Sequence, residues 1–125
     1  MVKLESLKKS NQFKKVLKEK KVHSEYFSIF AAKNFYKHKY KTNLLISFIM
    51  KKKIGNAVKR NRIKRRLKSI VHKLLKRNSV INLNYTYVIF GKEKVYKEEN
   101  DSLFENMKKS FKRMDGIKLW KLSII

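Results

Sequence analysis

Residues 44–77 read LLISFIMKKKIGNAVKRNRIKRRLKSIVHKLLKR, and this stretch holds the pattern that decides the fold. The apolar run from Leu44 to Lys51 predicts a buried strand. Gly55 and Asn56 then open a helix that is expected to run to about Arg77. Apolar residues recur along that helix at the spacing of a single face: Ile63, Leu67, Ile70, Val71, Leu74 and Leu75. A strand that leads into an amphipathic helix indicates a helix packed on a sheet.

The flanking segments extend this unit into a single domain over residues 1–125. A first helix is expected over about 11–20 with Ser10 as its N-cap, and strands are expected within 22–32 and over 85–90. The elements then follow the order α-β-β-β-α-β-α, which describes a small two-layer α/β sandwich of the α+β class. We find no internal repeat or low-complexity linker that would indicate a second domain.

The last helix is predicted from a capping box, with Ser102 at the N-cap and Glu105 three residues later. We expect this helix to stop at Gly116, because glycine commonly follows the end of a helix. No element is predicted for residues 117–125, which form an unassigned C-terminal tail.

Another segment, 33–43, is expected to be a loop. Its aromatic residues are Phe35, Tyr36 and Tyr40, which either close a hairpin or stack on RNA.

The charge of the chain indicates a polyanionic partner. Thirty-four Lys and Arg stand against nine Asp and Glu, which gives a formal net charge of +25. Nucleic acid is the commonest partner of such a protein. Four of the six arginines fall within residues 60–66, although lysine supplies the charge elsewhere. Arginine grips phosphate bidentately and stacks on bases, so this cluster indicates a dedicated contact surface.

The polar side of the basic helix forms a ridge opposite the apolar stripe. Its members are Arg62, Arg65, Ser69, His72 and Lys76, flanked by Asn61 and Lys68. Arg60 falls on the apolar side, so it can stay charged only if the first turn projects past the edge of the sheet. The lysines at 51–53 stand just before that turn. A projecting helix N-terminus beside lysines attracts phosphate through its dipole and its free N–H groups.

The run KKIGNAVKRNRIKRR at residues 52–66 closely resembles the protein subunit of bacterial ribonuclease P. The family signature is K-K-[IV]-G-N-A-V-x-R-N-R-x-K-R, and every fixed position is present. The resemblance extends over about residues 4–114. It implies a sandwich with a left-handed βαβ crossover, whereas the general rule for parallel strands would predict a right-handed one.

The resemblance also implies the function. The family's protein is an accessory subunit bound to a large catalytic RNA, which removes 5′ leaders from precursor transfer RNA. The resemblance implies that Mg²⁺ is held by RNA and not by protein ligands. A cytoplasmic location is expected from the basic composition and the lack of a signal segment, and no catalytic residue is expected in this chain. No membrane contact and no obligate protein partner are expected. The positions implied to contact the catalytic RNA are Lys52, Lys53, Asn56, Arg60, Asn61, Arg62, Lys64, Arg65, Arg66 and Lys68.

A cleft between the first helix and the sheet is implied to hold the single-stranded leader. The positions matching its lining are Phe13, Leu17, Phe30 and Lys51. Aromatic faces stack on bases of any identity, which suits leaders of varied sequence. Leu17 stands where some members have another aromatic residue, and Lys51 where many have serine. Phe13 and Phe30 are also plausible core residues, so spacing alone leaves both interpretations open.

Several other classes of protein are disfavoured. The chain has no cysteine, and its three histidines are scattered, so Cys-based zinc sites and thiol chemistry are excluded. We find no Ser-His-Asp set, HExxH motif or paired carboxylates. Glu98, Glu99 and Asp101 are better explained as acids at a helix start than as metal ligands. No secretory signal and no membrane span is expected.

One alternative stays open on composition alone, namely a general or ribosome-associated RNA-binding protein with no role in transfer-RNA processing. It would share the charge but would not need the motif at residues 52–66. A DNA-binding helix-turn-helix would need a short helix before the basic helix, where a strand is predicted. A peripheral membrane helix would place Trp or Phe opposite the charges, where this helix has Ile, Val and Leu.

Overall fold

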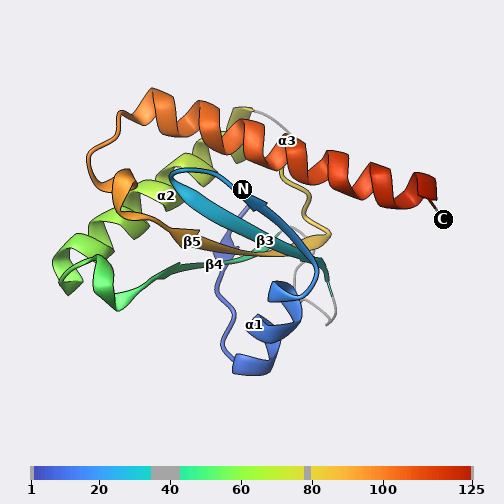
Figure 1. The fold of residues 1–125 in the computed structure, drawn as a ribbon, viewed down its shortest axis with the longest axis horizontal. Coiled ribbons are helices and arrows are strands. Elements are labelled where there is room, and N and C mark those ends of the chain that lie inside the picture. Colours follow the sequence, from blue (N-terminus) through green and yellow to red (C-terminus); the bar gives the residue numbers. More distant parts are fainter. Residues whose placement is uncertain (1, 35–42, 78–79, 125) are drawn as a thin grey trace.

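The computed structural model describes residues 2–34, 43–77 and 80–124, with 115–124 described by their backbone alone. It shows one five-stranded sheet with three α-helices (Figure 1). The strands are β1 (Leu4–Glu5), β2 (Lys20–His23), β3 (Phe27–Lys33), β4 (Leu44–Met50) and β5 (Tyr85–Gly91). The helices are α1 (Ser10–Leu17), α2 (Ala57–Arg77) and α3 (Asn100–Ile124), with short 3₁₀ helices η1 (Lys52–Ile54) and η2 (Glu93–Tyr96).

The strand order in the sheet is β1-β4-β5-β3-β2. Strands β4 and β5 are parallel neighbours with Phe48 opposite Ile89, and α2 makes the crossover between them. Strand β3 runs antiparallel to both β5 and β2. The predicted α+β class and the predicted order of elements are therefore confirmed, with β1 added at the N-terminal side. The left-handed crossover stays a prediction from the resemblance.

The two faces of the sheet are covered by different helices (Figure 1). Alternate residues of β3 show the division, since Phe27 and Ile29 belong to the large core under α2 and α3. Phe30 and Ala32 belong to a smaller cluster under α1. Gly91 lets α2 approach the end of β5 closely, because an added methyl group there would lie 3.0 Å from Ile63. The cluster under α1 leaves Phe13, Phe30 and Phe90 only partly buried, which matters for the site.

The first helix differs from its prediction at both ends. Its N-cap is Lys9 and not Ser10, which is the first helical residue. The Gln12 side chain supplies the acceptor at this end, since its Oε1 lies 3.2 Å from the backbone nitrogen of Lys9. The helix ends at Leu17 and not near residue 20, because Lys20 already pairs with Ala31 in the sheet.

The last helix also begins and ends elsewhere than predicted. It begins at Asn100, so Ser102 lies inside the first turn and is not the N-cap. The prediction that it stops at Gly116 is wrong, because the helix continues to Ile124 and projects beyond the sheet (Figure 1). A glycine inside a helix costs only about 1 kcal/mol relative to alanine, and the chain has no proline to end the helix.

Candidate nucleic-acid interface

The start of α2 projects past the edge of the sheet, as predicted from the place of Arg60 on the apolar side of the helix. Val58 is 75% exposed in the first turn, and Arg60 is half-buried with its Nε 3.4 Å from the carbonyl oxygen of Asn56. Asn56 caps the helix, since its Oδ1 accepts the backbone N–H of Lys59 at 2.9 Å. Gly55 precedes it with φ of +153°, a conformation that favours glycine. The motif thus builds a capped helix end with η1 and its lysines beside it.

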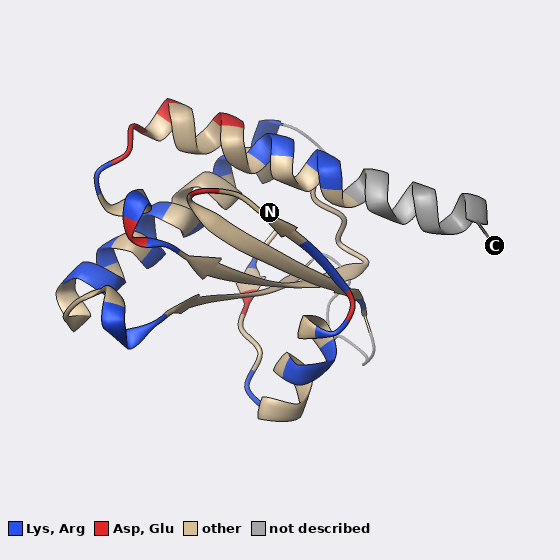
Figure 2. Cartoon of the chain, in the orientation of Figure 1, with Lys and Arg blue, Asp and Glu red and all other residues tan. Residues whose placement is uncertain are grey.

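The outward side of α2 carries the predicted ridge. Its exposed polar residues are Asn61, Arg62, Arg65, Ser69, His72, Lys73 and Lys76. Arg62, Arg65 and Lys73 also line a hollow of about 360 Å³ that reaches Asn100 at the start of α3. Figure 2 shows basic residues following α2 and continuing onto η1. Closely spaced cations beside a hollow favour the binding of phosphate groups.

One predicted contact residue, Arg66, faces its own chain. Its guanidinium donates hydrogen bonds to the backbone carbonyls of Val95 and Glu98, and to Oδ1 of Asn100 at 2.9 Å. Burial lowers the pKa of Arg66, and the neighbouring charge of Arg62 lowers it further. Arg66 therefore ties α2 to the segment before α3. Its helical-wheel position at the edge of the apolar stripe was the signal for this role.

Replacing Arg66 with methionine is expected to lower the free energy of unfolding by about 1–3 kcal/mol, because carbonyl groups would lose a charged donor. The matched control is Arg65→Met, which removes the same charge from an exposed position one residue earlier. That control should change the unfolding free energy by less than about 0.5 kcal/mol. Urea denaturation of the two variants measures the difference, and equal effects would contradict the assigned role of Arg66.

The α1 side of the sheet presents a partly exposed aromatic surface. Phe13 from α1, Phe30 from β3 and Phe90 from β5 all pack on the small cluster around Val16 and Val88. The rings of Phe30 and Phe90 meet edge to face with centroids 5.5 Å apart. Val16 is fully buried and anchors α1 on the sheet, whereas Leu17 is 37% exposed. Phe13 and Phe30 are therefore neither wholly core nor wholly surface residues.

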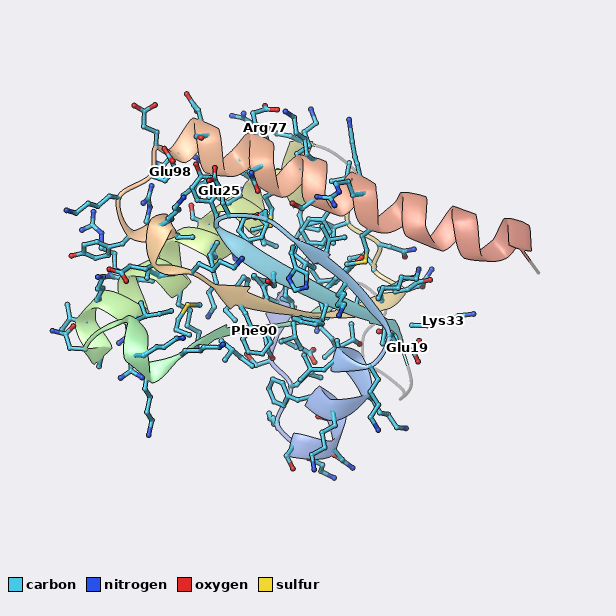
Figure 3. The ribbon with its side chains drawn as sticks, in the orientation of Figure 1. Glu19, Glu25, Lys33, Arg77, Phe90 and Glu98 are labelled. Atoms are coloured by element: carbon cyan, nitrogen blue, oxygen red, sulfur yellow. The ribbon has the colours of Figure 1, made fainter. Side chains whose placement is uncertain are left out.

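A pocket of about 570 Å³ opens at one end of this surface, where β5 and Phe90 lie close to η1 (Figure 3). Its apolar wall includes Phe30, Phe90 and Ile54, and its basic rim includes Lys51, Lys53 and Lys92. The remaining lining residues are His23, Ser28, Gly91 and Glu93. The His23 ring is held by a 2.7 Å hydrogen bond between its Nδ1 and Oγ of Ser28. Apolar platforms with lysines at the rim suit single-stranded nucleic acid.

The pocket joins two of the four predicted leader residues, Phe30 and Lys51. Phe13 lies in the adjoining aromatic cluster, and Leu17 lies at the exposed edge of α1. Phe90 was missed as a site residue, although the alternation of β5 gave a signal for it. Ile89 faces the large core, so Phe90 must face α1. Phe35, Tyr36 and Tyr40 lie outside the described residues.

Comparison with known families identifies the family of this chain. The model of the family described as Ribonuclease P matches residues 1–115. The chain belongs to the Ribonuclease P family. No curated protein matches the chain. The prediction from the motif at residues 52–66 is thereby confirmed. As the family implies, the chain is a protein subunit of ribonuclease P, acts in transfer-RNA processing, and works with ribonuclease P RNA and precursor transfer RNA.

Solved structures agree with the fold. The ribonuclease P protein from Thermotoga maritima is 24% identical, with a TM-score of 0.68 over 87% of this chain and 96% of that one. The protein from Staphylococcus aureus is 23% identical, with a TM-score of 0.62 over 90% of this chain and 94% of that one. Within the described ranges, no helix is long and apolar enough to cross a membrane.

Proposed function

We propose that the subunit binds two RNAs on two separate surfaces. The outward face of α2, with η1, docks on the catalytic RNA, and the aromatic surface beside α1 holds the 5′ leader of precursor transfer RNA. The observation that carries this proposal is the placement of α2 and the aromatic surface on opposite faces of one sheet. The lysines at 51–53 connect the two at the end of β4. A subunit with this function is expected in the cytoplasm.

Docking on the catalytic RNA is assigned to the cations that the fold leaves accessible. These are Lys52, Lys53, Arg60, Arg62, Lys64, Arg65 and Lys68, with the amides of Asn56 and Asn61 between them. Arg62 and Arg65 are the strongest candidates, because both are exposed and both line the hollow beside α2. Guanidinium groups can each hold a phosphate through two hydrogen bonds. Arg66 takes a smaller part, since its donors are engaged with carbonyl groups.

Binding of the leader is assigned to Phe13, Phe30 and Lys51, with Leu17 at the edge of the cleft. Phe90 and Lys92 join them because both line the same pocket as Phe30. Bases stack on aromatic faces without regard to sequence, and lysines follow the phosphates. This chemistry matches a substrate segment that is single-stranded and of variable sequence.

Cleavage is assigned to the catalytic RNA and the Mg²⁺ that it holds, with no catalytic group from this chain. The carboxylates support this assignment because several already have structural partners. Glu93 pairs with Lys59 at 2.9 Å, and Glu25 pairs with Lys94 at 3.1 Å. Tyr26 donates a 2.5 Å hydrogen bond to Glu98, which raises the pKa of Tyr26 to about 12 and lowers that of Glu98. The described residues hold no group of three His, Asp or Glu side chains suited to a metal ion.

Replacing Phe13 with leucine is expected to weaken binding of long-leader precursor by about 1–3 kcal/mol, the loss of one stacked base. Leucine keeps most of the apolar volume, so the fold and assembly with the catalytic RNA should survive. Affinity for mature transfer RNA should hardly change. The measurement titrates the holoenzyme against precursors with long and minimal leaders, and against mature transfer RNA.

The matched control is Phe104→Leu, which removes a half-buried ring from α3 on the opposite face of the sheet. It should leave the discrimination between precursor and mature transfer RNA unchanged. If Phe13→Leu loses assembly, or loses precursor and mature transfer RNA equally, Phe13 is a core residue and the leader lies elsewhere.

A further inference from the structure

Three cations of α2 contact the protein's own chain, and one of them, Arg62, also belongs to the exposed ridge. Lys59, Arg62 and Arg66 are spaced by three and four residues, so they lie on one side of the helix. Like charges at this spacing repel one another and would tend to splay the side chains apart. The segment from Glu93 to Asn100 covers this side of the helix and contacts all three.

Each of these cations has at least one partner in that segment. The Glu93 carboxylate forms an ion pair with Lys59, with Oε1 2.9 Å from Nζ. Two backbone carbonyls and the Asn100 side chain accept hydrogen bonds from the guanidinium of Arg66. The ring of Tyr96 lies beside two of the cations. Lys59 Nζ is 5.1 Å and Arg62 Cζ is 5.3 Å from the ring centroid. Both distances are within the range of a cation–π contact.

Arg62 is distinct among the three because it takes part in both environments. It is exposed and lines the hollow between α2 and the start of α3, while its guanidinium lies near the Tyr96 ring. Contact with a ring face leaves the N–H donors of a guanidinium free at its edge, where a phosphate would be bound. The aromatic partner therefore restrains the side chain without consuming its hydrogen-bonding capacity.

We propose that Tyr96 is a positioning residue that holds Arg62 in the orientation needed to grip a phosphate of the catalytic RNA. This inference rests on the proposed docking of α2 on that RNA. By ordering the arginine before binding, the ring reduces the conformational entropy lost when the phosphate contact forms. Tyr96 itself contacts no RNA in this arrangement.

The test is a double-mutant cycle on assembly with the cognate ribonuclease P RNA. Tyr96→Leu keeps apolar volume and removes the ring, so it should weaken assembly about fivefold, as expected for the loss of exposed cation–π contacts. Tyr96→Phe keeps the ring and should bind within about twofold of the parent, and Tyr96→Trp should bind at least as tightly. In an Arg62→Ala background, Tyr96→Leu should have less than about a twofold effect, because the group it positions is gone.

Three results would overturn the inference: no loss with Tyr96→Leu, an equal loss in the Arg62→Ala background, or the same loss with Tyr96→Phe. Thermal melting of each variant confirms folding, and Tyr96→Met replaces Tyr96→Leu if the leucine variant unfolds. Failure of the proposed docking gives a different pattern, in which Arg62→Ala alone leaves assembly unchanged. An effect of Arg62→Ala without an effect of Tyr96→Leu rejects only the positioning role.

Discussion

Replacing both Arg62 and Arg65 with alanine is expected to weaken assembly with the catalytic RNA by about 3–6 kcal/mol. The estimate takes about 1.5–3 kcal/mol for each charge-assisted phosphate contact. Both side chains are exposed on α2, so their removal should leave the free energy of unfolding nearly unchanged. Filter binding or fluorescence titration of the protein against the RNA measures the loss directly.

The matched control replaces Lys109 and Lys112 with alanine. These exposed lysines lie on α3, and their loss changes the net charge by the same two units. If assembly depends on the position of the charges, this control should lose far less than the arginine pair. Equal losses in the two variants would show that only the total charge matters, and would contradict docking through α2.

Assembly is also expected to weaken about 250- to 1,000-fold when monovalent salt rises from about 50 to 200 mM. About six neutralised phosphates, each contributing about −0.7 to −0.9, give a log–log slope of about −4 to −5. Affinity measured at four or more salt concentrations gives the slope. The Arg62→Ala, Arg65→Ala variant should flatten it by about 1.5, because two of those phosphates are no longer contacted.

Phe13→Leu serves as the control for the salt experiment, since it removes no charge. Its assembly slope should equal that of the parent even though it binds long leaders less tightly. A parent slope near zero would contradict electrostatic docking altogether. An equally flattened slope in the Phe13 variant would place α1 at the interface with the catalytic RNA.

Local patterns predicted β4, α2 and β5 almost to the residue, because each has a regular apolar pattern and starts directly after an asparagine. They missed β1, which is two residues long and exists through pairing of Leu4 with Leu44, forty residues away. They misplaced the start of α3 because the Ser102–Glu105 pattern of a capping box lies within the helix, two residues after it begins. Such boundaries depend on partners that the local sequence does not contain.

The candidate site, too, was predicted from local sequence only in part. The motif at residues 52–66 identified the basic helix, and the structure places most of its cations where RNA could reach them. The inward role of Arg66 depends on carbonyl groups 29 and 32 residues further along the chain. Likewise, the pocket containing Phe90 depends on pairing between distant strands, with Phe90 opposite Ser28. Sequence identified the residue types, whereas tertiary pairing decided which of them share a surface.

The position of β5 in the sheet has a consequence for synthesis of the chain. This strand is central, lying between β4 and β3, yet it is formed by residues 85–91. A nascent chain that has emerged only as far as α2 therefore carries four strands without the one that joins them. Folding must wait until about three-quarters of the chain is available. With no proline in the sequence, prolyl isomerisation adds no slow phase afterwards, so the pace of folding is set by closing these long-range strand pairs.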